Sequence, residues 1–308
     1  MKKILVTGLS GFIGTRLSEL FHRYSLIGVS RSVSRNGRIP ARNMIKADIT
    51  DEKELSKKIN NIEFDGIIHL AGITHIDRCE EDKINGKNGL AWKVNVTGTE
   101  NIIRACSQSG KFLLFLSTEC VFDGKKGFYK ESDTPSPVNW YGRTKYEAEK
   151  KILSSKINAC ILRSVLVYGH SKGYKVDLAK KFFELLKSGK KISAVNDQFV
   201  TFTFIDDLIG AINLAWDKKL TGIYHFAAET SLSPFEFART ISSGFGLNNK
   251  MIKQTTLEKF FGKSHRLRLV NSSLNSDKFR EFSRTRAKNL EDVVPILVKR
   301  WGKPGNIK

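Results

Sequence analysis

The chain has 308 residues, of which 40% are hydrophobic and 10% aromatic, so it can bury a substantial core and is not expected to be disordered. Lysine and arginine number 52 against 31 aspartates and glutamates, and this net charge of +21 attracts anions over the whole surface. The lysines are scattered in pairs without a nucleic-acid motif, so nucleic acid ranks last among the anionic partners.

Short apolar runs alternate with amphipathic stretches through the first 165 residues. Strands are predicted at 3–7, 25–29, 66–70, 111–117 and 159–165, and helices at 13–23, 53–59, 90–107 and 141–153. Continuous apolar strands that alternate with helices are typical of a parallel sheet covered by helices on both faces. The sequence therefore predicts an α/β protein with a Rossmann-type, doubly wound parallel sheet.

After residue 165 this alternation loosens. We expect a helix at 175–187, a strand at 199–205 that runs into a helix at 206–216, a strand at 222–227 and a helix at 233–245. Residues 1–165 are predicted to form the dinucleotide-binding domain, to which 199–227 return. Residues 166–198 and 228–308 are then a smaller, discontinuous substrate-binding region. The loop 123–140 is long, and loops of that length are usually functional or mobile.

Three glycines, Gly8, Gly11 and Gly14, lie between the first strand and the first helix. The first permits a tight turn, the second lets the backbone approach a pyrophosphate, and the third lets the helix pack closely on the strand. The N-terminus of the helix then offers unpaired N–H groups to the anion. This pattern predicts a bound nicotinamide dinucleotide, with further contacts from Ser10, Phe12 and Ile13.

The second strand is not followed by the carboxylate that would hold the adenosine ribose of NAD. Ser30, Arg31 and Arg35 stand there instead, and they can neutralise a 2′-phosphate. NADP(H) is therefore favoured, and NAD(H) is the alternative if these arginines are ordinary surface charges. Further cofactor contacts are expected after the third and fourth strands, from Asp48 and Ile49 at the adenine and from Leu70, Ala71 and Gly72 along the groove.

Tyr141 and Lys145 are four residues apart on a predicted helix and so share one face. A phenol with a pKa near ~10 is a poor acid at neutral pH, and an ammonium group nearby lowers that pKa. Thr118 follows an apolar strand, where its hydroxyl can hydrogen-bond a substrate oxygen. Together with the glycine turn, these three side chains predict a hydride-transfer site.

The chain resembles the extended short-chain dehydrogenase/reductase superfamily, of which the three-and-three glycine spacing is typical, and within it the dTDP-4-dehydrorhamnose reductase family. The resemblance spans nearly the whole chain and rests on Ala71–Glu80, Val94–Thr99, Ser117–Gly124, Tyr141–Lys145, Arg163–Gly169 and Asn271–Lys278. It implies a reductase of a nucleotide-linked 4-keto sugar. Tyr141 would protonate the oxyanion, Lys145 would lower the tyrosine pKa and hold the nicotinamide ribose, and Thr118 would orient the carbonyl.

The resemblance also implies binding residues outside this catalytic set. Asn95 is expected to contact the cofactor, and Thr74 and Glu119 the substrate. Arg163, Arg268 and Asn271 are further candidates for the sugar or the diphosphate, and a structural role is the alternative for each of them.

Several positions depart from the family pattern. Glu119 and Cys120 stand where the family has aspartate and tyrosine, Phe202 and Leu269 stand where it has proline, and residues 84–88 look inserted. The residues expected near the sugar thus differ from the family pattern, whereas those expected at the cofactor and in the catalytic set match it. Two alternatives therefore stay open: an NDP-sugar epimerase or dehydratase with tightly bound NAD, and a non-catalytic subunit similar to the regulatory β subunit of methionine adenosyltransferase.

The remaining features limit which partners and which cellular location we expect. The six histidines show no metal-ligand spacing, so no metal is expected. The four cysteines form no Cys-x-x-Cys pair, and no apolar run reaches the ~18 residues of a membrane helix. These features predict a cytoplasmic protein with reduced thiols and no membrane partner, and a homodimer is one candidate for its oligomeric state.

Overall fold

The computed structural model describes residues 2–31, 43–169 and 176–302. Its central sheet has seven strands in the order β10-β6-β5-β4-β1-β2-β3. These strands are β1 (Lys3–Thr7), β2 (Ser25–Ser30), β3 (Met44–Lys46), β4 (Gly66–His69), β5 (Phe112–Thr118), β6 (Ala159–Ser164) and β10 (Gly222–His225). The pairs β1–β2, β1–β4, β2–β3 and β4–β5 are parallel, so the predicted doubly wound sheet is confirmed.

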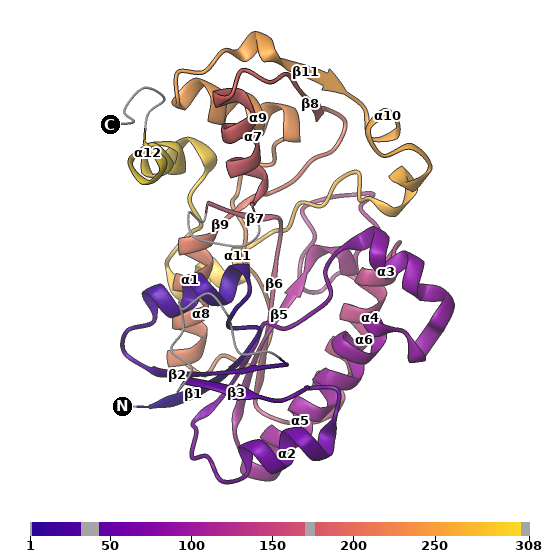
Figure 1. Ribbon diagram of the computed structural model, residues 1–308, viewed down its shortest axis with the longest axis vertical. Helices are drawn as coiled ribbons and strands as arrows, with labels where there is room; N and C mark the ends of the chain where they lie inside the picture. The colour runs from indigo at the N-terminus through magenta and orange to yellow at the C-terminus, as the bar shows by residue number, and fades with distance from the viewer. Residues whose placement is uncertain (1, 32–42, 170–175, 303–308) are drawn as a thin grey trace. The chain divides into compact units, whose positions relative to one another are not determined.

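The two faces of the sheet are covered by different helices (Figure 1). Helices α1 (Phe12–Leu20) and α8 (Ile205–Asp217) lie on one side, and α2 (Glu52–Ile59), α5 (Gly98–Ser109) and α6 (Trp140–Ser154) on the other. Burial on both faces explains why β4 and β6 are buried at every position and why both are largely apolar, except for His69 at the end of β4 and Arg163 and Ser164 at the end of β6. The strand order reverses between β1 and β4, and ligands of such sheets bind at the carboxyl ends of the strands on either side of this reversal.

The single helix expected at 90–107 is broken in the structure. It consists of α4 (Leu90–Trp92), a π-helical turn η3 (Lys93–Thr97) and α5, and it follows α3 (Ile76–Asp82) and the 3₁₀ helix η2 (Lys83–Asn88). A π turn inserts an extra residue into the helix, so a pattern with a fixed period of 3.6 residues does not reveal it. The buried side chain of Asn95 lies in this turn.

The later part of the chain forms smaller elements. Two short parallel sheets pair β8 (Ile192–Val195) with β11 (Ile252–Thr255), and β7 (Val167–Tyr168) with β9 (Thr203–Phe204). The expected strand at 199–205 is thus shorter, because Phe199 and Val200 make only isolated bridges. Helices in this part are α7 (Leu178–Lys187), α9 (Pro234–Gly244), α10 (Leu257–Phe261), α11 (Asp277–Ser283) and α12 (Leu290–Trp301). Besides η2, the described residues form the 3₁₀ helices η4 (Glu119–Val121), η5 (Asn249–Met251) and η6 (Gly262–Leu267).

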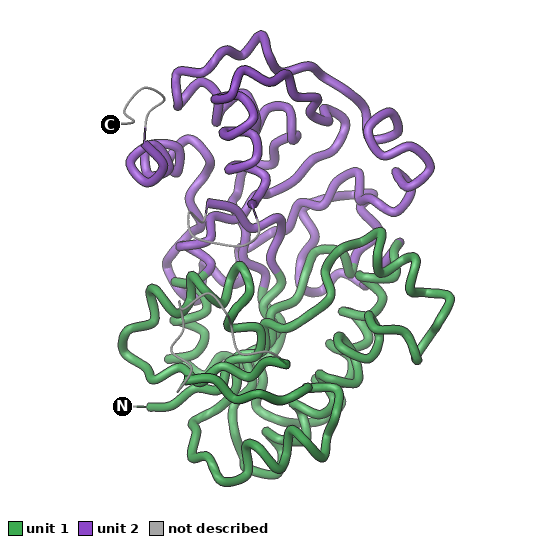
Figure 2. The backbone as a smooth tube through the Cα atoms, viewed as in Figure 1, with its two compact units in different colours: residues 1–121, 139–163, 209–224 green, residues 122–138, 164–208, 225–308 purple. Residues whose placement is uncertain are grey.

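The chain divides into two compact units (Figure 2). Unit 1 contains residues 1–121, 139–163 and 209–224, and unit 2 contains residues 122–138, 164–208 and 225–308. Residues 122–138 and 199–208 therefore group with unit 2, although the sequence division placed them with the dinucleotide-binding domain. The functional division itself stays a prediction. Within the described ranges, every helix is too short or too polar to cross a membrane.

Candidate functional site

The turn between β1 and α1 requires glycine at two positions for different reasons. Gly8 has a φ of +72°, and a Cβ there would lie 2.8 Å from the backbone nitrogen of Ala71. Gly14 lies inside α1, where a Cβ would come within 2.3 Å of the Gly8 carbonyl oxygen. The Gly11 N–H donates to that same oxygen at 2.9 Å and closes the turn. The turn thus brings the start of α1 against the ends of β1 and β4.

The N-terminus of α1 is suited to an anion. Its N-cap residue, Gly11, supplies no side-chain hydrogen bond, and the first turn holds no acidic residue. Such a helix end carries a partial positive charge, and its N–H groups point along the helix axis. Phe12 and Ile13, two of the expected cofactor contacts, form the first turn together with Gly14. Ser10 lies in the preceding turn.

A buried hydrogen-bond network connects the ends of β1 and β4 with α5. The Thr99 hydroxyl donates to the Asn95 carbonyl at 2.7 Å, so it accepts from Nε2 of His69 at 3.0 Å. Nδ1 of His69 then accepts from the Thr7 hydroxyl, which in turn accepts from the Ala71 N–H at 3.2 Å. Burial lowers the pKa of His69 to about 3, and the Lys145 charge adds to this effect. The imidazole is therefore neutral, and it is connected to the Ala71 N–H through the Thr7 hydroxyl.

Asn95 uses its side chain to hold this loop against α6. Its Oδ1 accepts from the Ile73 N–H at 2.8 Å, and its Nδ2 donates to the Ile73 carbonyl at 2.9 Å and to the Thr144 hydroxyl at 2.8 Å. A Cβ on Gly72 would lie 3.1 Å from the same Oδ1. The side-chain amide of Asn95, a predicted cofactor residue, therefore positions the loop around Gly72 and Ile73.

Thr118, Tyr141 and Lys145 meet at the carboxyl end of β5. All three are buried, and the neighbouring Thr118 side chain lowers the pKa of the Tyr141 phenol. Helix α6 begins at a fixed point, because the Asn139 side chain accepts from the Gly142 N–H at 2.7 Å and Glu80 accepts from the Trp140 N–H at 2.9 Å. The three side chains that the sequence singled out are thus in one place.

Burial is the largest influence on the pKa values of Tyr141 and Lys145, which both lie on α6. It lowers the pKa of Lys145 to about 7, with Glu149 acting in the opposite direction. The Lys145 Nζ donates to the Leu116 carbonyl at 2.7 Å and lies 3.7 Å from the centroid of the Phe115 ring. Burial raises the pKa of Tyr141 well above its usual value, with Cys120 and Glu119 adding to this effect and Thr118 acting against it. The lowering of the tyrosine pKa that we expected from Lys145 stays a prediction.

The residues expected at the adenine side of the cofactor lie at the ends of β2 and β3. Ser30 ends β2, and its carbonyl accepts from the Ala47 N–H at 3.0 Å, while Arg31 follows as an exposed residue. Asp48 already accepts from the N–H and the hydroxyl of Thr50, both at 2.9 Å. The Ile49 carbonyl accepts from Asn101 at 2.8 Å. Arg35 lies outside the described residues.

The expected substrate residues fall into three environments. Thr74 is exposed after β4, and Glu119 is half-buried beside Thr118. Arg163 is 1% exposed and forms two bonds with Glu149, of 2.9 and 2.6 Å, so the geometry favours the structural alternative for it. Arg268 and Asn271 belong to unit 2, where Arg268 lies over the Phe261 ring and the Asn271 N–H donates to Gly124. Their role toward a substrate stays a prediction.

Sequence reasoning missed the supporting residues of the site. Thr7, His69, Thr99 and Thr144 are fully or almost fully buried polar side chains that satisfy one another or the backbone. A threonine or histidine inside an otherwise apolar strand or helix was the available signal. Buried polar groups need partners, so such residues identify networks even where the partners are far apart in the sequence.

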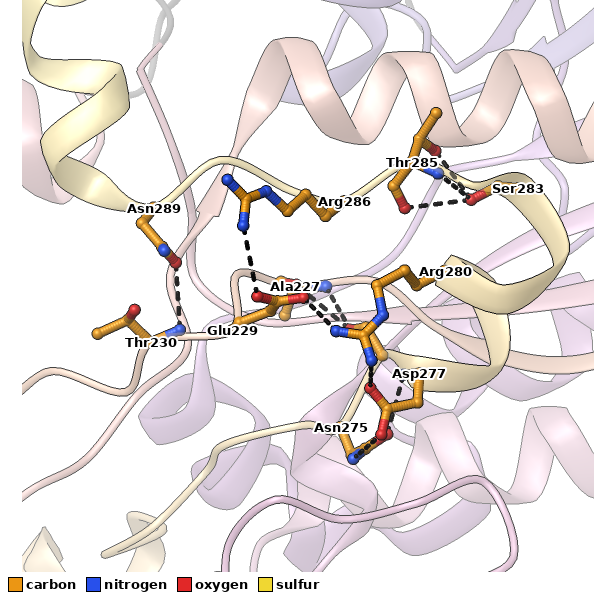
Figure 3. Close-up of polar contacts among 11 residues, drawn as sticks. Ala227, Glu229, Thr230, Asn275, Asp277, Arg280, Ser283, Thr285, Arg286 and Asn289 are labelled. Atoms are coloured by element: carbon orange, nitrogen blue, oxygen red, sulfur yellow. Dashed lines mark hydrogen bonds and ion pairs between the residues drawn. The ribbon is translucent and has the colours of Figure 1, made fainter.

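Unit 2 contains a separate polar cluster near its C-terminal helices (Figure 3). The Glu229 carboxylate accepts from Arg280 and lies 3.9 Å from Arg286. Arg280 also pairs with Asp277 at 2.7 Å, and Asp277 accepts from Asn275 at 2.9 Å. These carboxylates neutralise part of the basic C-terminal segment within the unit. No group of metal-ligating side chains occurs in the part of the chain that the structure describes.

Comparison with known proteins agrees with this arrangement. A dTDP-4-dehydrorhamnose reductase from Aggregatibacter actinomycetemcomitans is 29% identical over 251 residues, 78% of each chain. The β subunit of methionine adenosyltransferase 2 from Rattus norvegicus is 24% identical over 313 residues, 97% of this chain and 90% of the other. A crystal structure of dTDP-4-dehydrorhamnose reductase from Bacillus anthracis in complex with NADP gives a TM-score of 0.84 at 26% identity, covering 97% and 100% of the two chains.

A family model that matches nearly the whole chain shows the family. The model of the RmlD substrate binding domain family matches residues 1–301, which include the glycine turn, the Thr118–Tyr141–Lys145 set and the C-terminal segment. The chain therefore belongs to the RmlD substrate binding domain family, within the extended short-chain dehydrogenases/reductases.

Proposed function

We propose that the protein is an NADP(H)-dependent reductase of a nucleotide-linked 4-keto sugar. The observation that carries this proposal is the meeting of Thr118, Tyr141 and Lys145 at the end of β5, in the same unit as the glycine turn. The similar Bacillus anthracis reductase was crystallised with NADP, and the end of β2 carries Arg31 in place of a carboxylate.

A bound nicotinamide supplies the hydride for the carbonyl carbon. The Tyr141 phenol donates its proton to the carbonyl oxygen as negative charge develops there, and the Thr118 hydroxyl orients that carbonyl. Lys145 lies on the same face of α6 as Tyr141 and offers an ammonium group to the nicotinamide ribose. The α1 N-terminus holds the pyrophosphate.

The test is an NADPH-oxidation assay over a panel of nucleotide-linked 4-keto sugars. We expect turnover by the wild type, and a loss of about 10²–10⁴-fold in kcat for Tyr141→Phe, because a positioned proton donor contributes that much. The variant should still bind NADPH, since the glycine turn is unchanged. Wild-type rates in Tyr141→Phe would remove the tyrosine from the mechanism.

A second candidate is a binding subunit, and the observation that favours it is the 24% identity to the methionine adenosyltransferase β subunit over 97% of the chain. It predicts co-purification with a partner and no turnover across the panel. The epimerase or dehydratase alternative predicts NAD retained through purification and no net NADPH consumption. A cytoplasmic location, a homodimer and the absence of a nucleic-acid partner stay predictions.

A further inference from the structure

Three ionisable side chains follow one another along the buried face of α6. Tyr141, Lys145 and Glu149 are spaced by four residues, so they share that face, and they are 9%, 5% and 0% exposed. The proposed reaction uses the tyrosine for its proton and the lysine for its charge. Glu149 lies one helical turn beyond the lysine, is fully buried, and has no part in that reaction.

The Glu149 carboxylate is bonded to two neighbouring strands of the central sheet, β5 and β6. The Ser117 hydroxyl of β5 donates to Glu149 Oε1 at 2.6 Å. On β6, the Arg163 Nε donates to the same oxygen at 2.9 Å, and the Arg163 Nη2 donates to Glu149 Oε2 at 2.6 Å. Both carboxylate oxygens are thus hydrogen-bonded, and this one side chain joins α6 to two strands.

Ser117 lies between two positions of β5 that belong to the site. Thr118 follows it, and Leu116 precedes it with the carbonyl that accepts from the Lys145 Nζ at 2.7 Å. Helix α6 is therefore bonded to β5 at two successive strand residues, once through Lys145 and once through Glu149. Since these two bonds start one helical turn apart on α6, together they fix both the rotation of the helix and its position along the strand.

Stability alone does not explain a buried ion pair at this junction. Removing two charges from water costs much of what their attraction returns, and apolar side chains of similar volume are often as stable. The neighbouring positions Ala148 and Ile152 are buried and apolar, and apolar contacts are non-directional, so they leave α6 free to shift along β5. A guanidinium bonded at two points to a carboxylate has a defined geometry and favours a single arrangement.

We propose that Glu149 is a positioning residue, which fixes α6 on β5 and thereby holds Tyr141 and Lys145 in register with Thr118. The inference rests on the proposed function. Arg163 is the counter-charge of this carboxylate, which gives the arginine a structural role. The Glu149 charge also acts on Lys145, since it raises the pKa of the lysine against the larger effect of burial. A misplacement of about 1 Å at a reacting group can cost ~100-fold in rate, so a junction of this kind can control kcat.

The first test removes the bond to β5 and leaves the ion pair in place. Ser117→Ala lacks the hydroxyl that donates to Glu149, and its matched control, Ser164→Ala, lacks a buried hydroxyl that donates to Thr203 at 3.1 Å. We expect kcat of Ser117→Ala to fall about 10-fold, less than the ~100-fold of a full misplacement, because Arg163 still holds the carboxylate. KM for the keto sugar and Kd for NADPH should change little, and Ser164→Ala should keep the wild-type kcat. A wild-type kcat in Ser117→Ala would overturn the inference.

The second test separates positioning from stability. Glu149→Gln alone leaves the Arg163 charge buried without its carboxylate and can fail to fold, so both residues are replaced together. Glu149→Met/Arg163→Met removes the charges and the bond to Ser117, whereas Glu149→Gln/Arg163→Gln removes the charges but keeps an oxygen that accepts from Ser117. Thermal unfolding checks that both double variants fold. We expect kcat to fall about 100-fold in the methionine variant and at least about 5-fold less in the glutamine variant. Equal kcat values would mean that the bond to Ser117 does not position α6.

Amide hydrogen exchange separates failure of this inference from failure of the proposed function. In the free protein, Ser117→Ala should speed exchange at the amides of residues 140–149, and Ser164→Ala should not. Unchanged exchange in Ser117→Ala overturns the positioning role of Glu149, even if the wild type reduces a 4-keto sugar. Faster exchange in Ser117→Ala, together with a wild type that reduces no 4-keto sugar, supports the fixing of α6 and overturns the proposed function.

Discussion

At the scale of single residues, the site depends on polar and charged groups placed inside the protein. Lys145 is 5% exposed, and its ammonium has a carbonyl oxygen and a ring face as neighbours. A charged amine in such surroundings is costly, which is why its pKa falls to about 7 from 10.5. The residue proposed for hydride transfer is therefore also a source of instability.

Replacement of this lysine should raise the stability of the protein in a pH-dependent way. The lysine pKa is 10.5 in the unfolded chain and about 7 in the folded one, so the unfolded chain binds more protons between these values. The cost of burying Lys145 is thus fully present below pH 7 and shrinks as pH rises toward 10.5.

Lys145→Met should therefore increase the Tm relative to wild type more at pH 6 than at pH 9, by at least ~2 °C. Thermal unfolding of the free protein measures this. Lys151→Met, on the exposed side of α6, is the matched control and should show nearly the same difference at both pH values. An equal gain for Lys145→Met at both pH values would contradict a depressed lysine pKa.

At the scale of elements, the glycine turn depends on the distance between backbone segments. The position of Gly14 inside α1 allows the helix to approach the turn more closely than any side chain would permit. The position of Gly210 in α8 is different, because a Cβ there would meet no atom within 4 Å. A methyl group would therefore clash with the backbone at Gly14 but would meet open space at Gly210, although both glycines lie in helices.

Gly14→Ala should destabilise the protein by about 1–3 kcal/mol, the usual cost of overpacking, and should abolish NADPH binding because the turn must open. Gly210→Ala should instead stabilise it by roughly 0.5–1 kcal/mol, since alanine is the better helix former, and leave binding intact. Urea unfolding and a fluorescence titration with NADPH measure both effects. NADPH binding retained by Gly14→Ala would mean that the turn does not hold the cofactor.

At the scale of the whole molecule, the excess of basic residues acts on every anionic ligand. Some basic residues pair with carboxylates at the surface, such as Glu229 and Asp207 in unit 2, but a net charge of +21 remains after every acidic residue is counted. Exposed pairs of this kind contribute little to stability, but the residual positive charge attracts anions over distances of about a Debye length, ~8 Å at physiological salt.

This charge predicts a salt dependence that distinguishes the two nicotinamide cofactors. NADPH carries a 2′-phosphate with a charge of about −1.5 to −2, which we place near Arg31. Its Kd should therefore rise more steeply with NaCl than that of NADH, and Arg31→Ala should reduce the difference. Isothermal titration at several salt concentrations gives both slopes, and equal slopes would contradict recognition of the 2′-phosphate at the end of β2.

The agreement between sequence and structure was best where the signal is local. The predicted strands lie within two residues of β1, β2, β4, β5, β6 and β10, because a strand buried on both faces is a continuous apolar run. The π turn at Lys93–Thr97 was not predicted, because a pattern with a fixed period of 3.6 residues does not reveal it and the partners of its Asn95, Ile73 and Thr144, are distant in sequence. The strand expected at 199–205 was too long for a similar reason, since pairing depends on a partner strand.

The sequence by itself determined the doubly wound fold and the glycine turn, since each depends on residues that are close together in the chain. It also predicted the Thr118–Tyr141–Lys145 set, whose chemical role stays a prediction. Only the tertiary structure decided how these groups are held and charged. It placed Arg163 in a buried pair with Glu149, His69 in a neutral network, and Glu119 on the hydroxyl of Thr118. The physical reason is that burial and hydrogen-bond partners set the charge of a side chain, and both are properties of the packed chain.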